Sequence, residues 1–254
     1  MAPRARTEGR IMSTATAAHA DDANDGGSPA MHQRVLDAVG TAIAGGDLPP
    51  GSRLTLEGLQ QEYGVSRTVA RDTMKVLESM NLVYSRRRVG IVVQRRELWN
   101  VFDPKLVRWR LASDRRARQY SSLTELRIAV EPIAAAGAAR RASAEERSQL
   151  VALAADLRRL GEAGELQAFL AADIAFHSLL LRSCGNEMFS ALEGMVAEVL
   201  TSRTHQGLMP FKPRPEALDA HEEVAAAVAG GDTTAAESAM HHILNEVREA
   251  MGLH

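Results

Sequence analysis

The chain has 254 residues, of which 45% are hydrophobic and 24% charged, and a formal net charge of −2, a balance typical of globular proteins long enough for two domains. Aromatic residues make up only 4%, so the abundant Ala and Leu favour packed helices over a β-sandwich. The single cysteine, Cys184, excludes an internal disulfide, and we find neither a signal-peptide core nor an apolar run of membrane-spanning length. We therefore expect a mainly α-helical, cytoplasmic protein that does not associate with a membrane.

The first part of the chain is predicted to be a tail followed by two helices. Residues 1–29 lack apolar periodicity and are rich in Ala, Asp, Gly and Thr, so we expect them to be disordered. A helix is predicted over 32–46, where two glycines stop it, and a turn over 48–54. A second helix covers 56–63 and ends at Gly64, the position of a tight turn between helices.

A third helix follows Ser66, whose side chain can cap it by accepting hydrogen bonds from free backbone N–H groups. Its two faces differ in composition. The face expected to meet a core carries small and apolar side chains at helical spacing: Ala70, Thr73, Met74, Leu77 and Met80. The opposite face carries Arg67, Thr68, Arg71 and Lys75. The helix is therefore expected to pack against a core with its apolar face and to contact a ligand with its basic face.

A basic hairpin is predicted next, over residues 81–94, where apolar and polar residues alternate. Its tip carries Arg86, Arg87, Arg88 and Gly90. Between Val65 and Arg96 eight cations accompany only two anions, which leaves a local charge of +6. Such a run can be a solvated surface, but its position on a helix and on the hairpin after it favours DNA binding. Three helices and a β-wing predict a winged helix-turn-helix, which we assign to residues 30–96.

This region resembles the DNA-binding domain of the GntR family of bacterial regulators. The resemblance covers residues 31–95 and is carried by the motifs PPGSRL, EYGVSRT and VGIVV. It implies that the third helix enters the major groove of double-stranded DNA and that the wing lies along the minor groove. The DNA-binding residues are then Ser66, Arg67, Thr68, Arg71, Lys75, Arg86, Arg87, Arg88 and Gly90. Glu57 stands where some relatives carry a further DNA-binding arginine, so we do not expect that contact.

A linker and a helical bundle make up the rest of the chain. The linker is predicted over residues 97–117, with Trp99, Phe102 and Trp109 packing the two halves together. From 118 to 254 the pattern is helical, and Gly, Pro and polar turns divide it into six helices. We expect an all-α bundle of about 135 residues, which is large enough to fold alone.

Three polar residues fall on apolar stripes of this bundle. Asp173 and His177 lie one turn apart on the inner face of one helix, and His221 lies on the inner stripe of a later one. A buried carboxylate must be paired, hydrogen-bonded or bound to a metal. The spacing suits a shared cation, while a structural Asp–His hydrogen bond is the alternative that the pattern leaves open.

The bundle resembles the FCD effector domain of the FadR subfamily of GntR regulators, through the motifs LTELRIAVEP, DIAFHSLLLRSCGN and HEEVAAAVAGGD. Many members bind a divalent metal through one Asp and three His, and the metal holds a small carboxylate effector. The resemblance implies that Asp173, His177 and His221 bind zinc, nickel or manganese. The fourth ligand position is Ile243 here. The adjacent histidines, 241 and 242, do not replace it, because each residue on a helix is turned by about 100°.

An anionic effector also needs a counter-charge, and the resemblance places Arg127 and Arg203 in the pocket, where each can pair with a carboxylate. A surface ion pair would explain each of them equally well. The residue at 243 and the linker sequence resemble those of regulators that repress sugar-acid catabolism, which implies an effector such as galactonate or gluconate. We therefore expect a homodimeric repressor, without catalytic residues, that releases its operator when the acid binds.

Two other functions remain open. A metal-dependent hydrolase would use the metal to activate water, but we find no inward glutamate placed as a general base, and the basic helix would remain unexplained. A constitutive DNA-binding protein with a purely structural bundle is the other alternative. Stabilisation of the protein by a ligand would exclude it.

Overall fold

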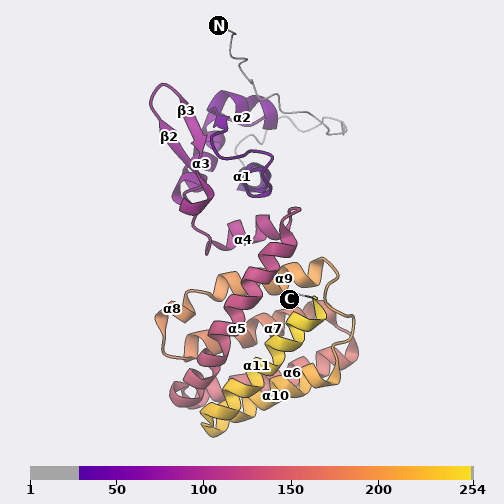
Figure 1. Cartoon of the computed structure of the whole chain (residues 1–254). Coiled ribbons are helices and arrows are strands. Elements are labelled where there is room, and N and C mark those ends of the chain that lie inside the picture. Colours follow the sequence, from indigo (N-terminus) through magenta and orange to yellow (C-terminus); the bar gives the residue numbers. More distant parts are fainter. Residues whose placement is uncertain (1–28, 253–254) are drawn as a thin grey trace.

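The structure is a computed structural model that describes residues 29–252, with a winged N-terminal part and a C-terminal helical bundle (Figure 1). The tail predicted over residues 1–29 lies outside the described residues except for Pro29, which begins the first helix. Within the described residues, no helix has both the length and the apolar content needed to cross a bilayer.

Three helices and a three-stranded sheet form the N-terminal part. The elements are α1 (Pro29–Gly45), β1 (Arg53–Leu54), α2 (Leu56–Tyr63), α3 (Arg67–Ser79), β2 (Val83–Arg86) and β3 (Gly90–Val93). The sheet is antiparallel with the order β1-β3-β2, and its β2–β3 hairpin is the predicted wing.

Strand β1 replaces part of the turn that the sequence predicted over 48–54. It pairs with β3 because the Gly51 N–H donates to the Val93 carbonyl and the Val93 N–H donates to the Ser52 carbonyl, both at 2.9 Å. A strand of two residues is too short to show the alternation by which strands are recognised in a sequence.

Helix α3 is held by the face that the sequence predicted. All five residues expected to face the core are buried: Ala70, Thr73, Met74, Leu77 and Met80. The Ser66 hydroxyl caps the helix by accepting a hydrogen bond from Val69 N–H at 3.3 Å. Gly64 ends α2 with a φ of 65°, a left-handed conformation that favours glycine and turns the chain into α3. The opposite face of α3 is thereby left exposed.

The predicted linker, residues 97–117, contains a helix of its own. A short 3-10 turn, η1 (Arg96–Leu98), precedes α4 (Pro104–Leu111), which Asp103 caps. The two sides of α4 join different cores, the N-terminal one through Leu106 and Trp109 and that of the bundle through Val107 and Leu111. Helix α4 is therefore a packed bridge between the two halves (Figure 1).

The aromatic residues in and before α4 differ in how deeply they are buried. Trp99 and Trp109 are only 5% and 2% exposed, and both are packed in the N-terminal core. Phe102 is 53% exposed, so its predicted packing is wrong. It lies in the turn before α4, where the chain passes over the surface.

Seven helices form the bundle, one more than predicted. They are α5 (Arg116–Arg141), α6 (Ala144–Ala163), α7 (Leu166–Ser183), α8 (Glu187–Ser190), α9 (Glu193–His205), α10 (Pro215–Gly230) and α11 (Thr233–Ala250). The extra one arises because residues 187–205, predicted as one helix, divide into α8 and α9. Helix α11 packs against α5 and α10, and α6 packs against α7 and α10. Helices α5, α7, α9, α10 and α11 line the pocket described below.

Candidate functional site

The candidate DNA-binding residues lie on one exposed surface formed by α3 and the hairpin. All nine are exposed: Ser66, Arg67, Thr68, Arg71, Lys75, Arg86, Arg87, Arg88 and Gly90. The Glu78 carboxylate, near the end of α3, accepts a hydrogen bond from Ser85 N–H of β2 at 3.0 Å. This bond fixes the hairpin beside the helix, so the two basic elements present their charge together.

One contact on this surface concerns the arginine that the sequence singled out. Arg67 Nη2 lies 3.8 Å from Glu57 Oε1, and both side chains are 64% exposed. An exposed pair at this distance contributes little free energy. Arg67 is therefore free to leave Glu57 for a DNA base or phosphate.

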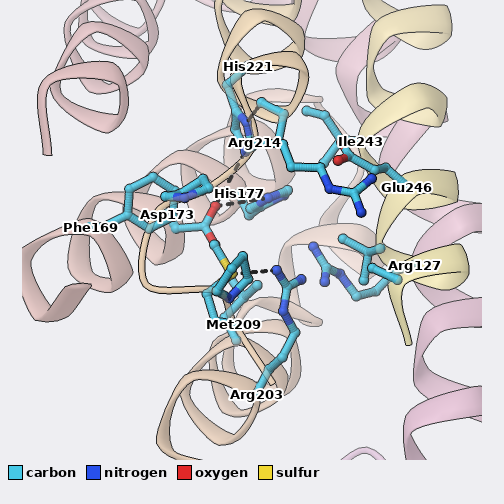
Figure 2. A pocket seen from close by; sticks show the side chains of 16 residues that line it. Arg127, Phe169, Asp173, His177, Arg203, Met209, Arg214, His221, Ile243 and Glu246 are labelled. Carbon is cyan, nitrogen blue, oxygen red and sulfur yellow. Dashed lines mark hydrogen bonds and ion pairs between the residues drawn. The ribbon is translucent and has the colours of Figure 1, made fainter. Parts of the chain in front are cut away.

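A second candidate site is a pocket between α5, α7, α9, α10 and α11 (Figure 2). Its polar lining consists of Arg127, Asp173, His177, Arg203, Arg214, His221 and Glu246. Apolar side chains, among them Phe169, Leu200, Ile243 and Val247, form the remaining walls. A few convergent polar groups in a largely apolar pocket are typical of small-molecule sites.

The three predicted metal ligands meet in this pocket. Asp173 Oδ1 lies 3.4 Å from His177 Nε2 and 3.4 Å from His221 Nε2. The three ligand atoms lie within 4.8 Å of one another, and all three residues are buried. The prediction that α7 and α10 bring these groups together is thus correct for their positions, while the metal itself remains a prediction.

The outer nitrogens of both imidazoles are already engaged. His221 Nδ1 lies 2.6 Å from the Ala217 carbonyl, which can only accept, so Nδ1 carries the hydrogen. His177 Nδ1 lies within ion-pair distance of Glu131 Oε2, at 2.7 Å. Both Nε2 atoms therefore face Asp173, and within the described residues His177 Nδ1 and His221 Nε2 are buried without a well-aligned hydrogen bond. Metal-binding histidines are commonly oriented in this way by outer partners, so the residues fit a cation.

A buried ion pair lies behind His177. Arg127 Nε lies 2.6 Å from Glu131 Oε1, with exposures of 2% and 3%. Burial alone would raise the pKa of Glu131, but the charges of Arg127 and His177 outweigh it and lower the pKa to about 2. For His177, burial alone would lower the pKa, but Glu131 and Asp173 raise it to about 9. The carboxylate of Glu131 is therefore permanently ionised.

Glu131 is an inward glutamate that the sequence analysis did not single out. It is buried beside the predicted metal ligands, but Arg127 and His177 both hold it, so it is not placed as a general base. Arg127 is paired with Glu131. The role of Arg127 as an effector contact remains a prediction. In the sequence, only the four-residue spacing of Arg127 and Glu131 indicates that these two side chains can be in contact.

Arg203 is one of two cations of the pocket, with Arg214, that have no carboxylate partner among the described residues. Among the described residues, no carboxylate lies within ion-pair distance of its guanidinium, whose hydrogen bond goes to Met209 Sδ. Burial lowers its pKa. Figure 2 shows the side chains of Arg203 and Arg127 pointing toward each other in the pocket. Arg203 is half-buried, and a guanidinium partly removed from water is stabilised by a counter-charge, so this position favours an anionic ligand.

Arg214 and Glu246 are pocket residues that the sequence analysis missed. Arg214 ends an irregular segment and immediately precedes α10, where no periodicity indicates which way a side chain points. Ile243 is 4% exposed and lines the pocket in the place of the fourth ligand. Neither His241 nor His242 lines it, in agreement with the angular argument.

Two family models match the chain. The model described as "Bacterial regulatory proteins, gntR family" matches residues 31–93, and the one described as "FCD domain" matches residues 122–246. The first contains the basic surface and the second contains the pocket.

Individual proteins resemble the chain over most of its length. It is 28% identical to the galactonate operon transcriptional repressor of Escherichia coli over 81% of this chain and 90% of that one. It is also 28% identical to the HTH-type transcriptional regulator LutR of Bacillus subtilis, over 82% and 95%. The solved structure of E. coli McbR/YncC shares the fold at 15% identity, with a TM-score of 0.51 over 87% of this chain and 97% of that one.

Proposed function

Because the chain belongs to the GntR family of bacterial regulators and carries an FCD domain, we propose that it is a repressor whose grip on its operator is released by a sugar acid. That it is a transcriptional regulator, and not an enzyme, follows from the families that match it and from its relatives. The repressor role, the acid, the metal and the homodimer are the proposed parts.

The DNA-binding surface supports the first step. Arg67 and Arg71 lie four residues apart on the exposed face of α3, the spacing that puts two side chains on one side of a helix. They would contact base edges in the major groove, where arginine pairs with guanine. The arginines at the tip of the wing, residues 86–88, would neutralise phosphates and so contribute affinity without sequence preference.

The pocket supports the second step. Asp173, His177 and His221 would hold a divalent zinc, nickel or manganese ion, which offers open positions to ligand oxygens. A 2-hydroxy acid fills two adjacent positions with a carboxylate oxygen and its neighbouring hydroxyl. Arg203, half-buried and without a carboxylate partner among the described residues, would take the second carboxylate oxygen. This uncompensated cation beside the trio is the observation that carries the proposal.

The identity of the acid rests on the name of a relative. The E. coli relative is named for the galactonate operon. Galactonate and gluconate are both 2-hydroxy acids. We propose an aldonic acid of this kind as the effector. Arg127 would contribute to the positive potential of the pocket while it remains bound to Glu131.

We further propose a cytoplasmic homodimer. Ile133 of α5 is 51% exposed and lines a surface cleft together with Phe189 of α8. Met188, beside it, is 69% exposed. Exposed apolar side chains such as Ile133 and Met188 can be covered by a second copy, and two copies would place two α3 helices on a palindromic operator.

Calorimetry over a panel of compounds tests the effector half of the proposal. We expect galactonate or gluconate to bind in the micromolar to millimolar range, and neutral sugars and acyl-CoA not to bind. Binding of a neutral sugar or of acyl-CoA alone, with no response to any hydroxy acid, would refute the pocket's proposed role.

A further inference from the structure

The pocket contains a second pair of polar side chains that neither the metal nor the carboxylate would use. We propose that Glu246 and Arg214 recognise the tail of the effector and select one that is neutral and hydroxylated. The inference rests on the proposed function, in which Asp173, His177, His221 and Arg203 hold the acidic head of the ligand.

The two side chains reach the pocket from different elements. Glu246 lies on α11, one turn after Ile243, and Arg214 immediately precedes α10. In Figure 2 the Arg214 side chain extends toward Glu246, on the side of the pocket away from Phe169. The pair therefore stands apart from the trio and faces the remainder of any ligand whose head is bound there.

Neither side chain has its hydrogen-bonding capacity satisfied by the protein. Among residues 29–252, no ion pair or hydrogen bond engages the Glu246 carboxylate or the Arg214 guanidinium. By contrast, Arg127 of the same pocket is paired with Glu131 at 2.6 Å. Arg214 is exposed and Glu246 half-buried, so water hydrates both groups until a ligand replaces it, and the acceptor and the donor are available to that ligand.

The chemistry of this pair matches a polyol. A carboxylate only accepts hydrogen bonds and a guanidinium only donates them, whereas a hydroxyl group does both. Successive hydroxyls of one chain can therefore donate to Glu246 and accept from Arg214, and the pair has no net charge for the ligand to balance.

Two other kinds of tail fit less well. An apolar tail would cover Glu246 and Arg214 without giving them partners, which costs the desolvation of both groups. A second carboxylate would lie near the negative charge of Glu246. The pair thus discriminates between acids that share the same head.

The experiment uses three six-carbon acids with the same 2-hydroxy acid head. Gluconate has a hydroxylated tail, 2-hydroxyhexanoate an apolar one, and glucarate a hydroxylated one that ends in a second carboxylate. Calorimetry on the full chain should show gluconate binding about tenfold or more tightly than either of the others, because one or two hydrogen bonds to charged groups are at stake.

Two substitutions separate charge from hydrogen bonding. Glu246→Gln keeps an acceptor but removes the charge, so we expect glucarate to gain about tenfold in affinity while gluconate changes much less. Glu246→Leu removes the acceptor, so gluconate should lose about tenfold while 2-hydroxyhexanoate does not weaken. Glu249→Gln is the matched control, because Glu249 is exposed on the same helix and does not line the pocket. Circular dichroism verifies that each variant folds.

Equal binding of the three acids by the wild-type protein, or equal effects of Glu246→Leu and Glu249→Gln, would overturn this inference and leave the proposed effector class intact. Failure of all three acids to bind the wild-type protein, or binding that survives Asp173→Ala unchanged, would overturn the proposed function and this inference with it.

Discussion

Trp109 of α4 donates a hydrogen bond from its indole Nε1 to Asp37 Oδ1 of α1 at 2.7 Å. The preceding residue of the helix, Arg108, lies between two carboxylates, 3.8 Å from Asp37 and 3.9 Å from Glu198 of α9. Helix α9 also carries Arg203 of the pocket. A continuous set of contacts therefore joins the pocket to the DNA-binding part, and a ligand that moves α9 would act on α1 through α4.

The packing of Trp109 gives the first prediction. A Cβ atom added to Gly40 of α1 would lie 2.5 Å from the indole ring, so Gly40→Ala should force the two halves apart locally and lower the free energy of unfolding by about 1–3 kcal/mol. Chemical denaturation measures this difference. Gly230→Ala is the control: nothing lies within 4 Å of the added atom, so its stability should stay the same or rise by up to about 1 kcal/mol. Equal stability of the two variants would contradict the tight contact.

The second prediction concerns operator recognition. Arg67→Ala and Arg71→Ala should each abolish specific operator binding without affecting the fold, because a base-edge contact contributes about 1–3 kcal/mol and occurs twice in a dimer. Fluorescence anisotropy with labelled operator DNA measures the affinity. Arg159→Ala removes the same charge from α6, where the side chain is 62% exposed, and should bind like the wild-type protein. The assignment of α3 fails if both α3 variants keep full operator affinity.

The third prediction concerns the metal. The purified protein should carry zinc, nickel or manganese in near-stoichiometric amount, and the combined Asp173→Ala and His177→Ala variant should lose it, since two of three ligands are removed. Elemental analysis by mass spectrometry measures the content. A variant with both His241 and His242 replaced by Ala should keep its metal, because neither lines the pocket. A fully stable wild-type protein without metal would mean that the trio is a hydrogen-bonded cluster.

The fourth prediction concerns the buried ion pair. Glu131→Leu leaves the Arg127 guanidinium buried and unpaired, so it should lower the free energy of unfolding by about 3–5 kcal/mol. The double variant Arg127→Met, Glu131→Leu should recover a large part of this loss, because no uncompensated charge remains. Urea denaturation of both variants measures the comparison. If the double variant proves no more stable than Glu131→Leu, the loss does not come from the stranded arginine.

Much of the fold and part of the site follow from the sequence, and the reason is periodicity. Helix α3 has a strongly amphipathic pattern, so both of its faces could be predicted residue by residue. Asp173, His177 and His221 interrupt apolar stripes, which marks them as inward-facing before any helix is placed against another. Their convergence then requires only that α7 and α10 share a core.

The remaining features depend on packing that the sequence does not encode locally. Glu131 contacts His177 only because α5 lies against α7 in one particular register. Arg214 lies in an irregular segment, and Phe102 lies in a turn, so neither has a periodic pattern that fixes the direction of its side chain. The helix inside the predicted linker has no clear periodic pattern, because α4 is only eight residues long and splits its apolar residues between two cores.

Operator affinity measured with and without an aldonic acid tests the central claim most directly. Labelled DNA from upstream of the gene is titrated with the full chain by fluorescence anisotropy, in the absence of acid and with saturating galactonate or gluconate. We predict specific binding without the acid and a loss of about 5- to 150-fold with it, with no such loss in Asp173→Ala. Specific binding whose affinity stays the same at saturating acid would contradict the account, since it would describe a constitutive DNA-binding protein.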